Sequence, residues 1–307
     1  MPSLFNPDYL KHLCQKYGLR PSKKYGQNYL VDPETIDTII VAAELSKDDT
    51  VIEVGPGFGT LTLALASRVE KVVAFEIEKK LEEYWKPARP AGGLENVEIV
   101  WGNILKELPK YQIPNTKYKV VANLPYQITS PVIRLFLETE HPPSEMILMV
   151  QKEVVERICA QPGDMSLLSV AVQYYAETEI VVIVPRSSFW PVPGVDSAVI
   201  KLSLRGATKE RRGDPADKRV GSESQWIATP RANSSRNDTF FFKIVRAGFS
   251  NRRKLLIKNV ESVVGKKNRK ALEEVFAVVG LTPQARAQEL SVEQWIKLAH
   301  FLLEIRN

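Results

Sequence analysis

Strand-like and helix-like segments alternate from residue 50 to residue 204, and this alternation restricts the fold more than any other feature. Strands are predicted at 50–54, 71–76, 97–101, 118–122, 145–150, 179–184 and 197–204. Helices are predicted before or between them at 33–45, 60–68, 77–85, 130–138 and 152–159. Such alternation is typical of a mostly parallel sheet covered by helices. Right-handed crossovers then place the carboxyl ends of the strands along one edge, where open α/β sheets bind ligands.

A second part of the sequence is predicted to be entirely helical. Its apolar residues follow helical spacing over 239–248, 252–264, 268–279 and 291–305. Residues 206–237 are rich in Gly, Ser, Pro and charge, which predicts a flexible linker or insertion. We therefore expect an N-terminal extension at 1–19, an α/β domain at 20–205 and a small all-α domain at 238–307.

Composition and cysteine usage restrict the class of protein. The 307 residues suffice for one large domain or two smaller ones. No apolar run is long enough to cross a bilayer, and the N-terminus lacks a secretory pattern, so we expect a cytoplasmic protein. Cys14 and Cys159 match no metal-binding spacing, and His12, His141 and His300 are equally scattered. The sequence thus argues against a metal site and against disulfides, and nothing in it indicates obligate dimerisation, so a monomer is expected.

Positive charge is concentrated in one segment. Residues 241–270 hold ten Lys or Arg and a single acid, Glu261. The segment carries +9 while the whole chain carries +6, so the remainder sums to −3. Most charge runs are simply solvated helix faces. Here the scarcity of acids and the interleaved apolar residues favour a polyanion partner, RNA or DNA.

The stretch "VIEVGPGFGTLTLA" places a glycine-rich loop between a strand and a helix. Gly55, Gly57 and Gly59 permit a tight turn and close approach of the backbone to a ligand. Glu76 ends the next strand, where an acid can accept hydrogen bonds from ribose hydroxyls. A glycine-rich loop alone is weak evidence, because it is also compatible with a structural turn or a dinucleotide site.

Two residues around this loop favour a methyl donor over a dinucleotide. Thr60 stands where the dinucleotide fingerprint has its third glycine or alanine. Glu53 puts a carboxylate close to the ligand, which suits a cationic group better than a pyrophosphate. S-adenosylmethionine has a sulfonium and an amino group but no phosphate, so it is the favoured ligand.

The segment Asn123-Leu124-Pro125-Tyr126 ends a predicted strand at the same sheet edge. Methylation of an exocyclic base amine would use acceptors for its N–H groups, because they stabilise the positive charge that develops on nitrogen. The Asn123 amide oxygen and the Leu124 carbonyl could be such acceptors, and Pro125 restricts the residue before it. Tyr126 offers a flat face for a base. In isolation the segment could equally be a strand-ending turn, but its place beside the glycine loop favours catalysis.

Six motifs in a fixed order resemble the ribosomal RNA adenine-N6,N6 dimethyltransferases of the KsgA type. These motifs are "KKYGQNYL" (23–30), "EVGPGFGTLT" (53–62), "NLPYQITSP" (123–131), "QKEVVERI" (151–158), "FWPVPGVDSAV" (189–199) and "FSNRRKLLIKN" (249–259). The tail at 280–302 is also similar. The resemblance covers nearly the whole chain except 1–20, about 86–93 and 206–237. It implies a Rossmann-like methyltransferase domain with an all-α C-terminal domain.

The resemblance implies a set of residues that bind S-adenosylmethionine. Gln27, Asn28 and Leu30 match the N-terminal motif that closes over the donor. Gly55 and Glu76 match positions that contact its methionine part and its ribose, and Gly57 and Gly59 complete the loop. Asn103 stands where the family usually has an aspartate that contacts the donor's adenine, and Asn123 adjoins the donor as well.

The resemblance also implies target and RNA contacts. Asn123, Leu124 and Tyr126 match the motif that receives the target amine, and Phe189 matches an aromatic that holds the target base opposite Tyr126. RNA-facing residues of the small domain are expected at Phe249, Arg252, Arg253, Lys254 and Lys258. Trp190 departs from the family, which commonly has a smaller residue there.

The implied function is S-adenosylmethionine-dependent dimethylation of N6 of two adjacent adenosines near the 3′ end of 16S rRNA, with a role in small-subunit biogenesis. One alternative is a large-subunit rRNA adenine-N6 methyltransferase of the macrolide-resistance type. Another is a non-catalytic ribosome-assembly or nucleic-acid-binding factor on the same fold.

Overall fold

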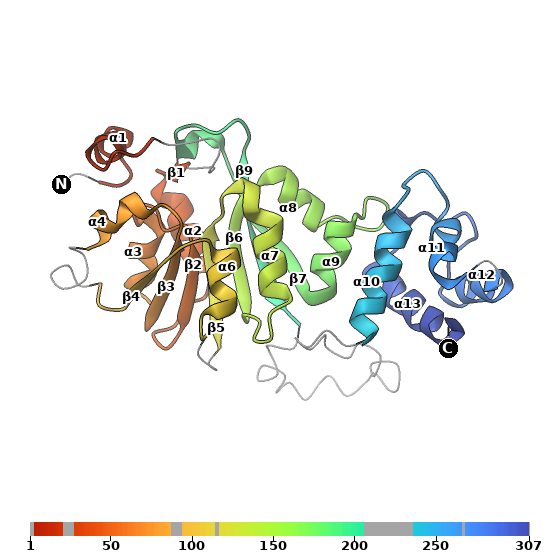
Figure 1. Cartoon of the computed structure of the whole chain (residues 1–307). Coiled ribbons are helices and arrows are strands. Elements are labelled where there is room, and N and C mark those ends of the chain that lie inside the picture. Colours follow the sequence, from red (N-terminus) through yellow and green to blue (C-terminus); the bar gives the residue numbers. More distant parts are fainter. Residues whose placement is uncertain are drawn as a thin grey trace, which may run out of the picture. The chain divides into compact units, whose positions relative to one another are not determined.

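The computed structural model describes residues 3–20, 28–86, 94–113, 117–205, 236–265 and 268–306 (Figure 1). Contacts separate these residues into two compact units. The first holds the described residues of Met1–Val155 and Thr178–Thr208, and the second those of Glu156–Glu177 and Lys209–Asn307. The predicted linker lies outside the described residues except for its last two positions, 236 and 237, which begin a helix.

The first unit is built on a seven-stranded sheet with the order β4-β3-β2-β5-β6-β9-β7. Its strands are β2 (Thr50–Val54), β3 (Lys71–Glu76), β4 (Val97–Trp101), β5 (Tyr118–Asn123), β6 (Glu145–Gln151), β7 (Ala176–Val184) and β9 (Ser197–Leu204). The strands from β2 to β6 run parallel, whereas β9 pairs antiparallel with β6. The predicted Rossmann-like α/β fold is thus confirmed, and the carboxyl ends of the parallel strands share one edge.

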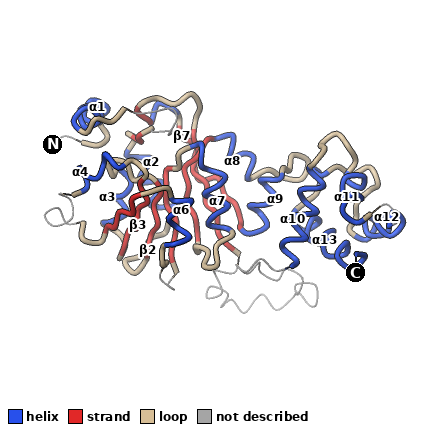
Figure 2. The backbone as a smooth tube through the Cα atoms, in the orientation of Figure 1, coloured by secondary structure: helices blue, strands red, loops and turns tan. Residues whose placement is uncertain are grey.

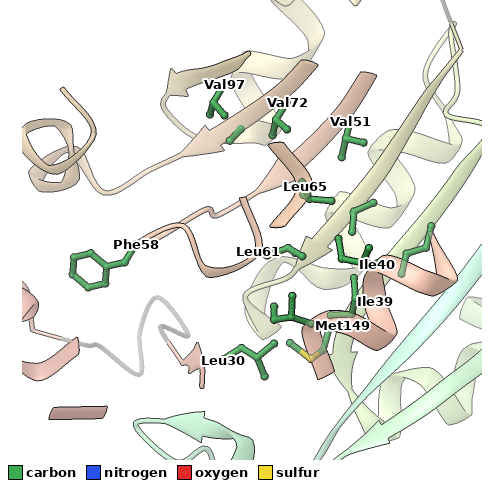
Figure 3. Packing of buried hydrophobic residues seen from close by; sticks show 14 of the residues in the cluster. Leu30, Ile39, Ile40, Val51, Phe58, Leu61, Leu65, Val72, Val97 and Met149 are labelled. Atoms are coloured by element: carbon green, nitrogen blue, oxygen red, sulfur yellow. The ribbon is translucent and has the colours of Figure 1, made fainter. Parts of the chain in front are cut away.

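Helices cover the sheet, as Figure 2 shows, and its central strands are largely apolar and buried, whereas the edge strand β7 is mostly exposed or half-buried. Every residue of β2 is buried. Ile39 and Ile40 of α2 (Pro33–Ala42) and Leu61 and Leu65 of α3 (Thr60–Ala66) belong to the same apolar core (Figure 3). The remaining helices of the layer are α6 (Ile104–Glu107), α7 (Thr129–Leu137) and α8 (Lys152–Ile158).

Local capping explains where some of these elements start. Asp32 caps α2 by accepting the Glu34 N–H at 3.2 Å. The helix predicted at 77–85 is instead a 3-10 turn, η2 (Lys79–Leu81), followed by α4 (Glu82–Trp85). The Glu78 N–H donates to the Glu76 carboxylate at 2.7 Å, and the Glu78 side chain caps the turn by accepting the Lys80 N–H at 3.2 Å, so the helical segment begins at Lys79.

Several elements of the first unit were not predicted, among them the short helix α6. Helix α1 (Pro7–Lys16) is capped by Asn6 and lies in the predicted N-terminal extension. Strands β1 (Tyr29–Leu30) and β8 (Phe189–Trp190) pair with each other as a small antiparallel sheet. Because each strand has only two residues, neither leaves a readable pattern of alternation.

The second unit is helical, as predicted. It contains α9 (Leu167–Tyr175), α10 (Arg236–Phe249), α11 (Leu256–Val264), α12 (Arg269–Val278) and α13 (Val292–Arg306). Its core centres on the fully buried Trp295. Helix α11 starts later than the predicted residue 252 because 252–254 form a turn. The buried Asn259 amide holds this turn by donating to the Gly248 and Asn251 carbonyls at 2.7 and 3.0 Å.

Residues 156–177 group with the helical unit by their contacts, although the sequence predicts them within the α/β domain. The Tyr174 ring of α9 stacks on Phe241 of α10, with 4.2 Å between ring centroids. The Met165 N–H also donates to the Gln288 carbonyl at 3.1 Å. These contacts join segments that are far apart in the sequence, and local patterns do not reveal them. Among the described helices, none has the length and hydrophobicity of a membrane span.

Replacement of Gly248 by alanine should destabilise the helical unit. Helix propensity alone would favour alanine by about 1 kcal/mol. However, an added Cβ would overlap the Trp295 ring and approach Leu256 Cδ1 to 2.9 Å. We expect a net loss of about 1–3 kcal/mol from overpacking, measured by urea unfolding. Gly194→Ala is the control, because no heavy atom lies within 4 Å of its added Cβ; equal stability of both variants would contradict the packing.

Candidate active site

The glycine loop connects β2 to α3 at the carboxyl edge of the sheet. Gly55, Gly57 and Gly59 have φ values of 74°, 56° and 93°, a backbone region that other residues rarely adopt. The Gly55 N–H donates to the Phe75 carbonyl of β3 at 2.9 Å. The Gly57 N–H donates to the Glu76 carboxylate at 3.1 Å. The loop is therefore fixed to the end of the neighbouring strand.

One pocket at this edge collects most of the predicted site residues. Its lining includes Asn28, Leu30, Gly55, Gly57, Glu76, Asn123, Leu124, Tyr126 and Phe189. These residues come from β1, the glycine loop, the ends of β3 and β5, and β8, so the fold brings together what the sequence spreads over more than half its length. The lining also includes Tyr29, Glu53, Pro56 and Thr60. The individual roles of all these residues remain predictions.

Three predicted donor residues do not line the pocket. Gln27 lies outside the described residues. Gly59 caps the start of α3 and faces Trp85. Asn103 caps α6, where its Oδ1 accepts the Leu105 N–H at 3.0 Å, so this oxygen already has a structural partner. Its amide nitrogen is the group that could still donate to a ligand.

Two buried carboxylates line the pocket in different environments. Glu76 accepts N–H groups of Gly57 and Glu78, and these bonds partly offset the rise in its pKa that burial causes. Glu53 is 2% exposed, and its Oε2 finds no hydrogen-bond partner among the described residues. Burial raises the pKa of Glu53 to about 8, with the Thr62 hydroxyl opposing the rise and the nearby Glu76 adding to it.

The Glu53 oxygen that lacks a hydrogen-bond partner in the described structure indicates which kind of ligand fits the site. A buried carboxylate without a partner is costly, and a cation beside it removes this cost. S-adenosylmethionine is cationic at its sulfonium and its amino group, so the donor set of this pocket fits it. A pyrophosphate would bring like charge next to Glu76 and would keep Glu53 in its protonated form, so it would gain nothing from that residue. The described residues contain no cluster of His, Cys, Asp or Glu that could hold a metal ion.

The segment after β5 is held by backbone and side-chain bonds. The Leu124 N–H donates to the Met149 carbonyl of β6 at 3.0 Å. The Asn123 amide nitrogen donates to the Asn28 carbonyl at 3.4 Å, which leaves its Oδ1 as the acceptor of the side chain. In the described structure the Leu124 carbonyl accepts no hydrogen bond, whereas the Pro125 carbonyl accepts the Ile128 N–H at 3.1 Å. Asn123 Oδ1 and the Leu124 carbonyl oxygen are therefore two neighbouring acceptors that a ligand could use.

Aromatic side chains border the same region. Tyr126 is half-buried, and its hydroxyl is hydrogen-bonded to the Ser197 hydroxyl at 2.8 Å, which fixes the ring. Phe189 is 2% exposed and pairs with Leu30 across the β1–β8 sheet. Trp190 pairs with Tyr29, and their rings stack with centroids 6.3 Å apart. The large side chain at position 190 therefore packs against Tyr29, a residue of the N-terminal segment that lines the pocket.

The predicted RNA-binding residues lie in the second unit. Arg252, Arg253, Lys254 and Lys258 are all exposed, around the turn between α10 and α11. Phe249 is only half-buried and packs against Trp295, with ring centroids 5.6 Å apart. Four exposed cations, three on the turn and Lys258 in α11, suit binding to phosphates, while Phe249 packs against the core.

Comparisons with known proteins agree with this geometry. Residues 18–212 match the family described as "Ribosomal RNA adenine dimethylase". Proteins named "Ribosomal RNA small subunit methyltransferase A" are similar: that of Lactococcus lactis is 37% identical (96% of this chain, 94% of the relative), and that of Clostridioides difficile is 38% identical (98% of each).

Solved structures of the same class are also similar. A dimethyladenosine transferase from Plasmodium falciparum has a TM-score of 0.68 at 26% identity, over 87% of this chain and 94% of that chain. The 23S rRNA methyltransferase ErmE has a TM-score of 0.67 at 26% identity, over 89% of this chain and 98% of that chain.

Donor affinity should depend on pH through Glu53. A bound cation favours the ionised carboxylate, so binding below about pH 8 releases a proton. The Kd for S-adenosylmethionine should fall as pH rises from 6 to 8, by up to about tenfold per pH unit, and then level off. Calorimetry in buffers of different ionisation enthalpy measures the proton release. Glu53→Gln should remove most of the pH dependence of this Kd. A wild-type Kd that does not change between pH 6 and pH 8 would refute the role of Glu53.

Proposed function

The chain belongs to the ribosomal RNA adenine dimethylase family, and we propose that it dimethylates N6 of two adjacent adenosines near the 3′ end of small-subunit rRNA. Its methyl donor is S-adenosylmethionine. The observation that carries the proposal is the single pocket shared by the glycine loop, Glu76 and Asn123-Leu124-Pro125-Tyr126. The names of the relatives support the small subunit as substrate.

The donor side of the pocket is formed by the glycine loop and two acids. S-adenosylmethionine supplies an electrophilic methyl group on a positively charged sulfur. Gly55 and Gly57 allow the backbone to approach the donor, and Glu76 offers carboxylate oxygens to ribose hydroxyls. Glu53 supplies a negative charge when a cationic ligand binds, because the cation favours its ionised form. These assignments rest on the lining of the pocket and on the chemistry of each side chain.

The target side offers acceptors instead of a strong base. Asn123 Oδ1 and the Leu124 carbonyl can accept the two N–H groups of the adenine amine. Accepting them favours a pyramidal nitrogen and stabilises the positive charge that develops as the methyl group arrives. The proton becomes acidic only after transfer, so alignment within the pocket is the main requirement. Tyr126 and Phe189 are aromatic neighbours that can hold the base.

The target adenine must leave its stack to enter the pocket, which favours a loop or a helix end in the RNA. Exposed cations of the second unit, Arg252, Arg253, Lys254 and Lys258, would bind phosphates of the same RNA. An rRNA substrate further implies a cytoplasmic protein, and we propose that it acts as a monomer on immature small subunits.

A large-subunit substrate is the second candidate, because the fold also resembles ErmE. The relatives named for the small subunit are 37–38% identical over nearly the whole chain, whereas ErmE is 26% identical. Incubation with labelled S-adenosylmethionine and either unmethylated small subunits or large subunits distinguishes the two. We expect label in the small subunit alone. Label in the large subunit would identify the large subunit as the substrate instead. If neither subunit were labelled although donor binding is confirmed, the enzymatic function would be refuted.

Asn123→Ala should separate catalysis from donor binding. Loss of the side-chain acceptor should lower the methylation rate by about 100-fold, while the Kd for S-adenosylmethionine changes little. Single-turnover methylation and calorimetry measure the two quantities. An equal loss of donor binding would instead indicate that Asn123 supports the donor side of the pocket.

Replacing Arg252, Arg253 and Lys254 with alanine should weaken the salt dependence of RNA binding. Loss of three phosphate contacts should reduce the slope of log K against log salt by about 2. Alanine at three exposed cations of the first unit, Lys11, Lys47 and Lys106, is the matched control. If both triple variants changed the slope equally, the turn would not be a specific RNA contact.

A further inference from the structure

Two aromatic side chains donate hydrogen bonds to carbonyl groups of the glycine loop. They are Tyr84 and Trp85, at the end of α4. Trp85 Nε1 donates to the Gly57 carbonyl at 3.0 Å. The Tyr84 hydroxyl donates to the next carbonyl along the loop, that of Phe58, at 2.8 Å. Successive peptide groups of the loop are therefore bound by successive residues of one short helix.

Packing makes these bonds difficult to replace by water. Trp85 is 4% exposed, and its ring leaves no room for a side chain at position 59, where a Cβ would lie 2.9 Å from Trp85 Cη2. Phe58 is 1% exposed and lies between Tyr84 and Tyr29, each 5.2 Å away between ring centroids. Tyr29 itself lines the pocket. The loop is thus enclosed between aromatic rings on both sides.

The N-terminal helix supports this arrangement. The Tyr17 ring at the end of α1 meets Tyr84 edge-on, with centroids 5.7 Å apart. Lys80 Nζ donates to the Gly18 carbonyl at 2.9 Å, which ties the end of α1 to η2. A segment that the sequence marks only as an extension therefore supports the element that holds the loop.

A loop of this composition needs such external restraint. Glycine has the largest choice of backbone conformations, so three glycines in five residues would otherwise sample many shapes. A peptide group is planar and trans, so fixing a carbonyl also fixes the N–H on the opposite side of the same group. The bonds from Tyr84 and Trp85 therefore set the orientation of the Phe58 and Gly59 amides before any ligand binds, and the Gly59 N–H is used within the loop, where it donates to the Pro56 carbonyl at 2.8 Å.

We propose that Tyr84 and Trp85 are positioning residues of the donor site, which hold the glycine loop in the shape that binds S-adenosylmethionine. They act through the loop carbonyls and not by touching the donor. The inference rests on the proposed function only in the identity of the ligand. Pre-organisation of this kind contributes to affinity because the free loop has less freedom to lose on binding.

Two conservative substitutions test the proposal. Tyr84→Phe removes the hydroxyl and Trp85→Phe removes the indole N–H, while each keeps an aromatic ring. We expect either variant to bind S-adenosylmethionine and S-adenosylhomocysteine about three- to tenfold more weakly by calorimetry, as the loss of one hydrogen bond implies. Hydrogen exchange in residues 55–60 should be faster in the free variants and should return to the wild-type rate with saturating S-adenosylhomocysteine.

A matched control distinguishes positioning from general destabilisation. Tyr118→Phe also removes a buried tyrosine hydroxyl bonded to a backbone carbonyl, that of His141 at 2.8 Å, but at the other end of the sheet. It should lower the Tm without changing the donor Kd or the turnover at saturating donor.

Unchanged donor Kd values in both Tyr84→Phe and Trp85→Phe would overturn the proposal, as would an equal loss in the Tyr118→Phe control. Because the readout is donor binding, it is independent of the RNA substrate. A wild-type chain that binds donor but methylates no rRNA would refute the proposed function alone. A wild-type chain that binds no donor would overturn both.

Discussion

The hydrogen bond from the Gly57 amide to the Glu76 carboxylate joins the two features on which the site depends. One is a loop with left-handed glycines at the end of β2, and the other is an acid at the end of β3. Parallel pairing of β2 with β3, and of β2 with β5, brings Gly55, Glu76 and Asn123 to the same edge. The donor loop and the target segment can therefore share one pocket without any long connection between them.

Electrostatics gives this edge its chemical character. Glu76 is held by backbone N–H groups, whereas Glu53 is buried with an oxygen that lacks a partner in the described structure. Two acids in one pocket disfavour anionic ligands and favour a cationic one. The target side has the neutral acceptors Asn123 and Leu124 instead. The same pocket thus attracts a positively charged donor and stabilises charge that moves onto a base amine.

The sheet and the main site could be predicted because they have local signatures. β2 and β3 were predicted with the bounds that the structure shows, since fully buried strands are continuous apolar runs between clear breaks. Glycine spacing and the Asn123 segment follow directly after such strands, so their edge could be inferred from topology.

Other features depend on contacts between distant segments and left no local signal. The pairing of β1 with β8 joins residues about 160 positions apart in sequence. The stacking of Tyr174 on Phe241 places α9 in the helical unit against the expected boundary. Asn103 is a helix cap, which a family position alone does not show. The sequence predicts Tyr84 and Trp85 only as part of a helix, although their polar atoms donate hydrogen bonds to the glycine loop.

The most direct test of the account is a crystal structure of the chain with S-adenosylhomocysteine and an RNA that contains the target adenosines. The account predicts that the exocyclic nitrogen of one adenine lies about 3 Å from both Asn123 Oδ1 and the Leu124 carbonyl, with Tyr126 and Phe189 beside the base. An adenine bound elsewhere, or a donor bound away from the glycine loop and Glu76, would contradict it.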